Sequence, residues 1–461
     1  MRESIAPAIA ANRYGLGARP GELEAIASDP RGWLAAQLSG PPPLLAGPGL
    51  VPSRQVLAQV LELRRMRRAA RADAALAQAK KLVELYRPVY VAEATARLAA
   101  AVASERPLLE RLTQFWSNHF AVSVDKFLVL GLAGSFEREA IRPHVLGRFS
   151  ELLLAVERHP AMLLYLDNAQ SMGPNSALVR RVSSRRPDAK LGINENLARE
   201  ILELHTLGVD GGYTQLDVTR FASVLSGWSI GGGFGRFADG EPGAFVFRPL
   251  LHEPGPQRLL GREYAQPGIE QGEAVLRELA RSPATAHRVA TQLAVHFIAD
   301  DPPAHAIEHL RRVFLHSDGD LPSLYRALIE LDEPWAMPLA KYKTPSEFVV
   351  SSYRALSQPV QQGRGGLAAL EQLGQRTWSP GSPAGWPDRG ADWNGASALL
   401  KRIEWAQALG ARLGAQLDAR ALAPQLLGAT LGEHTREAVA HAASGAQALT
   451  LLIASPEFLR R

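Results

Sequence analysis

Apolar residues at helical spacing recur along most of this chain, and they constrain its fold more than any other feature. Residues 53–104 are rich in Ala, Leu, Arg and Glu at this spacing, which is typical of long helices. Proline follows several leucine-rich runs, as in AVERHPAM and ELDEPWAM, and favours the first turn of a new helix. The same spacing predicts further helices at 106–124, 137–166, 194–207, 214–228, 269–281, 285–299, 303–315, 321–331, 344–356, 397–415, 431–440 and 445–460.

Three segments interrupt the helical pattern. Residues 171–192 are polar and basic, and they are predicted to form a long surface loop. Residues 229–264 are rich in Gly and Pro with short alternating runs such as AFVFRP, which predict one or two β-hairpins. Residues 377–396 form a third loop, rich in Gly, Pro and Trp. The expected fold class is therefore mainly α, a large multi-helix globular fold with small β-hairpin insertions.

The amino-acid composition excludes several classes of function. The chain has 461 residues, 46% of them hydrophobic, which is enough for a large core. It has no cysteine, which excludes disulfides, thiolate metal ligands and cysteine nucleophiles. The net charge of +5 is mild and the arginines are scattered apart from two clusters, so no nucleic-acid partner is expected. The RRMRRAARADA segment predicts a solvent-exposed or partner-facing helix; an RNA-binding helix is the alternative, but it lacks interleaved aromatic residues.

Neither a leader nor a membrane span is evident in the sequence. The first thirty residues contain no apolar run long enough for a signal peptide, and no stretch has the roughly 18 uninterrupted apolar residues of a membrane helix. The expected location is cytoplasmic for the chain as written, or periplasmic if a leader has been removed.

The stretch NENLAREILELH is the densest polar segment. Asn194 is predicted as the N-cap of a helix that ends before Gly208. Glu200 and Glu203 lie three residues apart and can share a metal ion, whereas His205 points elsewhere in a regular helix. On spacing alone, a solvated face held by pairs such as Glu195–Arg199 is the simpler interpretation.

Polar residues elsewhere favour a site. FWSNHF places Asn118 and His119 in an otherwise apolar helix, where they need partners or a cavity. LLYLDNAQS puts Asp167 and Asn168 at a helix end, and the turn after the dense stretch begins at Asp210. The expected ligand contacts outside the dense helix are Trp116, Asn118, Asp167, Asn168, Asn194, Trp228, His252 and Trp393.

The ordered motifs resemble a large bacterial family, catalogued as domain of unknown function 1800. The resemblance rests on FWSNHF, HPAMLLYLDNAQS, INENLAREILELHTLGVDGGYTQLDV, HEPGP, KYKTPSEFVV and GWPDRGADWNGASALL, which together span nearly the whole chain. The family usually has a histidine where Ser117 stands. The resemblance implies a helix-rich fold and no known reaction. Relatives often carry export signals and accompany sulfatase-like proteins, which implies envelope work and a sulfatase-like partner protein. Motifs from both halves predict one helical domain over 1–461.

A fainter likeness links the chain to the animal-type haem peroxidases. It rests on FWSNHF and NENLAREILEL in comparable order. The position of their proximal histidine holds no histidine here, which argues against haem ligation of that kind.

Two functions remain open from the sequence, beside a purely structural helical protein. The first is an enzyme or ligand-binding protein with a polar cleft, in which acid–base work would fall to His119, Glu195, Arg199, Glu200 and Glu203. A divalent cation is the cofactor that oxygen ligands would suit, with the metal ligands expected at Glu200, Glu203 and Asp210. The alternative is a non-catalytic envelope scaffold or carbohydrate-binding protein. In either case the expected ligand is an unknown small molecule or glycan.

Overall fold

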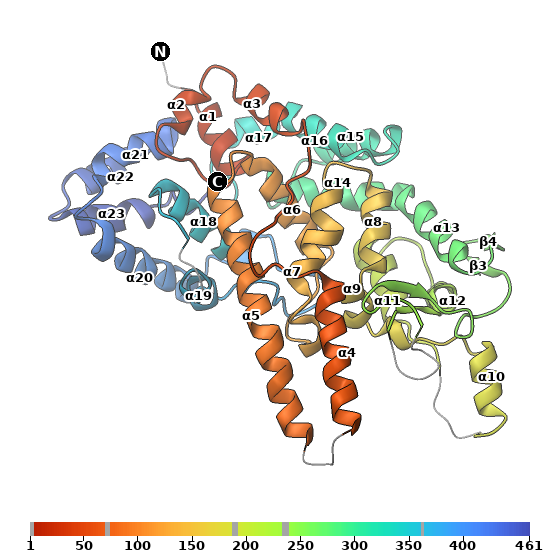
Figure 1. The fold of residues 1–461 in the computed structure, drawn as a ribbon. Helices are drawn as coiled ribbons and strands as arrows, with labels where there is room; N and C mark the ends of the chain where they lie inside the picture. Colours follow the sequence, from red (N-terminus) through yellow and green to blue (C-terminus); the bar gives the residue numbers. More distant parts are fainter. Residues whose placement is uncertain (1–3, 70–73, 187–191, 233–238, 361–363) are drawn as a thin grey trace.

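The computed structural model describes residues 4–69, 74–186, 192–232, 239–360 and 364–461 (Figure 1). Helices dominate it and the strands form only two small sheets, so the predicted mainly α fold with β-hairpin insertions is confirmed. Buried apolar side chains from Ala8 to Leu459 join in one hydrophobic core cluster. The single domain over 1–461 stays a prediction.

The first third of the chain contributes a long helical hairpin and a buried central helix. Its helices are α1 (Ala6–Ile9), the π-helical turn η1 (Ala10–Tyr14), α2 (Glu22–Ala25), α3 (Pro30–Gln37), α4 (Ser53–Ala69), α5 (Ala74–Ala103) and α6 (Pro107–His119). Helices α4 and α5 pack against each other and extend away from the other helices (Figure 1). Pro107 begins α6, which is buried on almost every side and ends in the FWSNHF motif.

The prediction of one helix over 137–166 is wrong, because Pro143, Gly147 and Pro160 divide the segment. The structure instead has short elements: η2 (Phe127–Val129), α7 (Ala133–Phe136), the π-helical turn η3 (Glu137–Ile141), η4 (Arg142–His144), α8 (Phe149–Arg158), α9 (Pro160–Tyr165) and η5 (Asn168–Gln170).

The prediction of a loop over 171–192 also needs correction. Helix α10 (Ala177–Ser183) lies within it, capped by the Ser176 hydroxyl, which accepts from the Val179 amide. Leu178 and Val179 are buried, so the segment is anchored by two apolar side chains rather than lying free on the surface. Residues 187–191 lie outside the described residues.

The dense stretch forms two helical types in succession. It folds as α11 (Asn196–Glu200) and then the π-helical turn η6 (Ile201–His205), rather than one regular helix over 195–207. Helix α12 (Gln215–Leu225) follows, started by a capping box between Thr214 and Asp217. A π-helical turn adds a residue to the helical repeat, which changes the direction of the side chains that follow it.

The predicted hairpins over 229–264 are present as two antiparallel pairs. Strand β1 (Trp228–Ile230) pairs with β2 (Phe245–Phe247), with Trp228 opposite Phe247. Strand β3 (Gln257–Leu259) pairs with β4 (Arg262–Tyr264), with Gln257 opposite Tyr264. Residues 233–238, inside the first hairpin, lie outside the described residues.

The second half of the chain, after the hairpins, is helical. They are α13 (Ile269–Ala280), α14 (Pro283–Phe297), α15 (Ala304–His316), α16 (Leu321–Glu330), α17 (Glu333–Ala336), α18 (Pro345–Ala355), α19 (Arg364–Gln372), η8 (Gly390–Asp392), α20 (Ala396–Leu413), α21 (Ala419–Leu427), η9 (Gly428–Thr430), α22 (Glu433–Ala440) and α23 (Gly445–Ile453). Among the described residues, none of the helices is long and apolar enough to cross a membrane.

Candidate functional site

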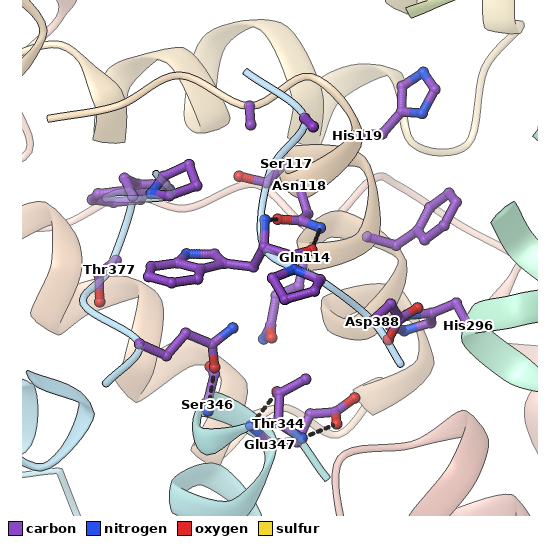
Figure 2. Close-up of a pocket in the computed structure, with 18 of the residues that line it drawn as sticks. Gln114, Ser117, Asn118, His119, His296, Thr344, Ser346, Glu347, Thr377 and Asp388 are labelled. Carbon is purple, nitrogen blue, oxygen red and sulfur yellow. Dashed lines mark hydrogen bonds and ion pairs between the residues drawn. The ribbon is translucent and has the colours of Figure 1, made fainter. Parts of the chain in front are cut away.

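A cavity of about 350 Å³ opens where four parts of the chain meet. Its walls are the C-terminal half of α6, one face of α14, the N-terminus of α18 and the loop that follows α19 (Figure 2). The volume lies at the lower end of the range for small-molecule sites. The lining combines amide and hydroxyl side chains with Phe115, Trp378 and Trp386.

Asn118 fixes the loop onto α6. Its Nδ2 donates to the Trp386 carbonyl at 2.9 Å, and its Oδ1 accepts from the Trp386 amide at 2.7 Å. Gly385 has φ +81°, and a Cβ there would lie 2.4 Å from the Asn118 carbonyl oxygen. Only glycine therefore allows the loop to approach the helix this closely. Asn118, predicted as a ligand contact, thus shapes the cavity through the loop.

Trp378 is held in an unusual conformation. Its φ of +50° is rare for a bulky side chain. The indole N–H donates to Glu137 at 3.3 Å, and the Arg97 guanidinium lies 5.6 Å from the ring centre. A strained backbone persists only where its surroundings fix it, so this indole is a rigid part of the cavity wall.

The floor of the cavity is charged but internally neutralised. Thr344 caps α18, and its amide donates to Glu347 at 2.8 Å. The Glu347 carboxylate also pairs with Arg111 and, at 3.0 Å, with Arg461. Although burial alone would raise the pKa of Glu347, these two arginines hold it well below its usual range. Glu347 is therefore an anion that already has its counterions.

His296 and Asp388 form a dyad at one side of the cavity (Figure 2). The distance between His296 Nδ1 and the Asp388 carboxylate is 2.7 Å, so Nδ1 carries the proton and Nε2 has the free lone pair. Nε2 lies 3.4 Å from Arg111 Nη1, at the long end of hydrogen bonding. Burial lowers the pKa of His296 although Asp388 opposes the shift.

Several polar groups at the cavity have no partner. Among the described residues, the side chains of Gln114, Ser346 and Thr377 make no hydrogen bond. Gln375 accepts from the Ser346 amide at 2.7 Å through Oε1, and its Nε2 has no acceptor among those residues. Thr377 is only 7% exposed. The other three side chains are half-buried, and the unpartnered atoms of the set are not sealed from solvent, so they can bond a ligand or water that enters the cavity.

His119 lines the same cavity, but its ring is already satisfied. Nε2 donates to the His205 carbonyl at 3.1 Å, and Nδ1 lies 2.7 Å from the Gln292 amide group. The ring therefore bonds an amide and a carbonyl, and none of the glutamates with which it was expected to share a cleft. Burial, reinforced by the positive charge of Arg288, lowers the pKa of His119 to about 3.

The carboxylates of the dense stretch lie outside the cavity lining, so the expected shared cleft with His119 is not this cavity. Glu200 is partly buried, which raises its pKa. Glu203 accepts from the Tyr213 hydroxyl at 3.4 Å, and Asp210 is exposed in the turn. Among the described residues, no three His, Asp or Glu side chains lie close enough to hold a metal ion. Binding of a divalent cation stays a prediction. Calorimetric titration with magnesium, calcium, manganese and zinc tests it.

Arg199 pairs with Glu195 at 3.2 Å, as its spacing predicts. The Arg199 side chain is 38% exposed, so this pair is not enclosed. Glu195 also accepts hydrogen bonds from Thr219 and Gln215. The hydrogen bond from Thr219 is the main cause of its lowered pKa. These contacts tie α11 to α12.

The π-helical turn η6 places His205 inside the core. His205 Nδ1 lies 2.7 Å from Glu157 on α8, and both side chains are almost completely buried. His205 Nε2 and Glu157 Oε2 have no partner among the described residues. This buried carboxylate–histidine contact therefore involves neither His119 nor the glutamates of the dense stretch.

The remaining predicted contacts hold the fold together elsewhere. Trp116 donates to Tyr325 at 2.6 Å, and Trp228 is completely buried. Two of them also pack against the cavity wall: the Trp116 ring lies 5.0 Å from that of Phe115, and the Trp393 ring lies 5.9 Å from that of Trp386. The other four have partners within the fold: Asn168 bonds the Leu225 and Trp228 carbonyls, Asp167 pairs with Lys126, Asn194 accepts from the Asn196 amide, and His252 bonds the Ser226 carbonyl.

Sequence reasoning missed most of the cavity lining. His296 and Gln292 lie in a helix whose pattern is ordinary, so no local signal marks them. Thr344, Ser346 and Glu347 fall within KYKTPSEFVV, and Trp386 and Asp388 within GWPDRGADWNGASALL. The density of polar residues in these two motifs was the available signal.

The fold is helical, and it holds a cavity of small-molecule size that joins α6, in the first third of the chain, to α14, α18 and the loop after α19. The family model described as "Protein of unknown function (DUF1800)" matches residues 9–460, so the chain belongs to this family. Comparisons with curated proteins and with solved structures found no match.

Proposed function

We propose that the chain binds a neutral, polyhydroxylated small molecule of carbohydrate type in this cavity. The observation that carries the proposal is the convergence of unpartnered amide and hydroxyl groups, from Gln114, Ser346, Thr377 and Gln375, on a space walled by indoles. Sugar hydroxyls both donate and accept hydrogen bonds, and sugar C–H faces pack on aromatic rings. Amides, hydroxyls and tryptophans match both properties.

Charge supports a neutral ligand. The two carboxylates of the lining, Glu347 and Asp388, are already paired with Arg461, and Asp388 also with His296. A cationic ligand would have to displace one of these buried pairs, which is strongly unfavourable. The two arginines of the lining, Arg97 and Arg376, are likewise paired, with Glu137 and Asp125.

Calorimetric titration with neutral mono- and oligosaccharides, beside glucuronic acid and glucosamine, tests the proposal. We expect a neutral sugar to bind, and Gln114→Leu and Thr377→Val to weaken its binding at least about tenfold, the loss of one to two hydrogen bonds. Gln425→Leu, at an exposed position of α21, is the control. Absence of binding across the neutral panel, or equal binding by the Gln114 variant, contradicts the proposal.

A second function, acid–base chemistry on the bound ligand, is favoured by the His296–Asp388 dyad. Asp388 orients the imidazole, and Nε2 can accept a proton from a ligand hydroxyl that displaces Arg111 from its long contact. In this proposal the resulting imidazolium is stabilised by Asp388. His296→Asn should then abolish turnover of a bound sugar while its dissociation constant stays within about threefold. Retained turnover in His296→Asn contradicts the catalytic role and leaves the binding proposal intact.

A further inference from the structure

The orientation of two glutamine side chains decides which hydrogen-bonding groups the cavity offers to a ligand. Gln292 on α14 and Gln375 in the loop after α19 both line the cavity. A carboxamide has a donor end and an acceptor end of nearly the same shape, so its hydrogen bonds determine which end faces which partner. Each glutamine can therefore be oriented from the groups that it contacts.

Gln375 is oriented by a backbone amide. Its Oε1 accepts from the Ser346 N–H at 2.7 Å. A backbone N–H can only donate, so the oxygen end must face Ser346. The other end is Nε2, which has no acceptor among the described residues. Gln375 therefore offers a hydrogen-bond donor to a ligand.

Gln292 is oriented by the protonation of His119. His119 Nε2 lies 3.1 Å from the His205 carbonyl oxygen, which can only accept, so Nε2 carries a proton. Burial, with the positive charge of Arg288, lowers the pKa of His119 to about 3, so the ring is neutral at neutral pH. A neutral imidazole that is protonated at Nε2 has a lone pair at Nδ1.

This lone pair decides which end of Gln292 faces the ring. Nδ1 lies 2.7 Å from the amide of Gln292, and the structure has Oε1 at that end. An oxygen there would set two lone pairs against each other, and a proton at Nδ1 instead would only move this repulsion to the His205 carbonyl. The NH₂ group must therefore face Nδ1 and donate to it. Oε1 then takes the other end of the amide, which has no partner among the described residues.

We propose that Gln292 and Gln375 give the cavity a fixed polarity, in which the ligand must donate a hydrogen bond to Gln292 and accept one from Gln375. The hydroxyls of Ser346 and Thr377 can rotate to either role, so they do not select in this way. A sugar hydroxyl satisfies Gln292, whereas an ether oxygen or a fluorine at the same place has no proton to donate. The class of ligand rests on the proposed function, but the orientation of the two amides does not.

Nuclear magnetic resonance of the full chain, labelled in its histidine and glutamine nitrogens, tests the orientation without a ligand. We expect His119 to be protonated at Nε2 alone, and a scalar coupling across the hydrogen bond between Gln292 Nε2 and His119 Nδ1. His119→Gln, which removes the imidazole, identifies these signals. A proton found at His119 Nδ1 overturns the proposal, because Gln292 would then offer its NH₂ group to the ligand.

Gln292→Glu separates the two orientations by an independent measurement. A carboxylate has no proton to donate to Nδ1, so it should force a proton onto His119, raise the pKa of His119 and lower the melting temperature. With a proton already at Nδ1, the same carboxylate would be a better acceptor and would raise the melting temperature. Gln416→Glu, at an exposed turn after α20, is the control for the change in charge. A melting temperature of Gln292→Glu equal to or above that of this control overturns the proposal.

Calorimetry with glucose, galactose, mannose and their monodeoxyfluoro derivatives tests the selection. Fluorination of the hydroxyl that donates to Gln292 should weaken binding at least about tenfold in the wild type, and should have no such effect in Gln292→Met. A loss of the same size in both proteins at every position overturns the selection by Gln292. Absence of binding by all three parent sugars contradicts the proposed function instead, and the polarity is then decided by the protonation of His119.

Discussion

The free energy of unfolding should decrease as the pH falls below about 6.5, because His119 stays neutral in the folded chain and becomes protonated in the unfolded chain. Burial lowers the pKa of His119 in the folded chain from 6.5 to about 3, with Arg288 adding to the shift. In the unfolded chain the same histidine takes up a proton near pH 6.5. The unfolded state therefore binds more protons at this histidine between the two pKa values, so the contribution of His119 to stability is fully present above pH 6.5 and declines down to about pH 3.

The magnitude follows from the size of this gap. Each pH unit below 6.5 costs about 1.36 kcal/mol, so at pH 5 the histidine should reduce the free energy of unfolding by about 2 kcal/mol. His119→Gln keeps a polar side chain opposite Gln292 and removes the titration. The difference between the unfolding free energies of wild type and variant should therefore fall by about 2 kcal/mol from pH 7.5 to pH 5.

Urea unfolding at pH 5, 6, 7 and 7.5 measures this difference, in which the other titrating groups largely cancel. His434→Gln, at an exposed position of α22, is the control. A difference that is constant with pH, or that grows in favour of the wild type at pH 5, would show that His119 is not held neutral by burial and would refute the reasoning.

Three further outcomes are expected. Asn118→Ala removes both hydrogen bonds to the Trp386 backbone and should lower the free energy of unfolding by about 1–3 kcal/mol in urea melts, with faster proteolysis of the loop. Arg199→Ala should cost no more than about 1 kcal/mol, because the pair with Glu195 is exposed; a larger cost would mean that the pair is enclosed. Limited proteolysis should first cut within 171–192 and leave one core, and the release of two independently folded halves would contradict a single domain.

Much of the fold follows from local sequence signals. The sequence TPSE predicts a helix start, with Pro345 in the first turn and a capping box between Thr344 and Glu347, and α18 begins there. The two hairpins of 229–264 follow from their Gly-rich alternating pattern. Helix α10 was missed, because Leu178 and Val179 are buried only by the tertiary fold, in which the Leu178 amide donates to the distant Leu250 carbonyl. Local patterns do not carry such long-range information.

The site was less predictable for a related reason. Residue spacing placed His205 away from Glu200 and Glu203, and it does lie in the core, but its partner Glu157 comes from α8, 48 residues earlier in the chain. The cavity itself joins α6 to α14, α18 and the loop at 377–396. More than 150 residues of sequence separate α6 from each of the other three. Its residues are ordinary in their own segments and become a site only when these segments meet.

The cavity is also tied to the stability of the whole molecule. Its floor draws on Arg111, Glu347, Asp388 and Arg461, and each makes an ion pair across a different part of the chain. Such a preorganised wall loses little conformational entropy when a ligand enters, so ordering of the site does not weaken binding. A ligand that binds only the folded chain stabilises it by about 2.7 kcal/mol at 100 times its dissociation constant. Because unfolding must disrupt this floor, a correct ligand should raise the melting temperature of the entire chain, and a thermal-shift screen of neutral sugars is the most direct way to find it.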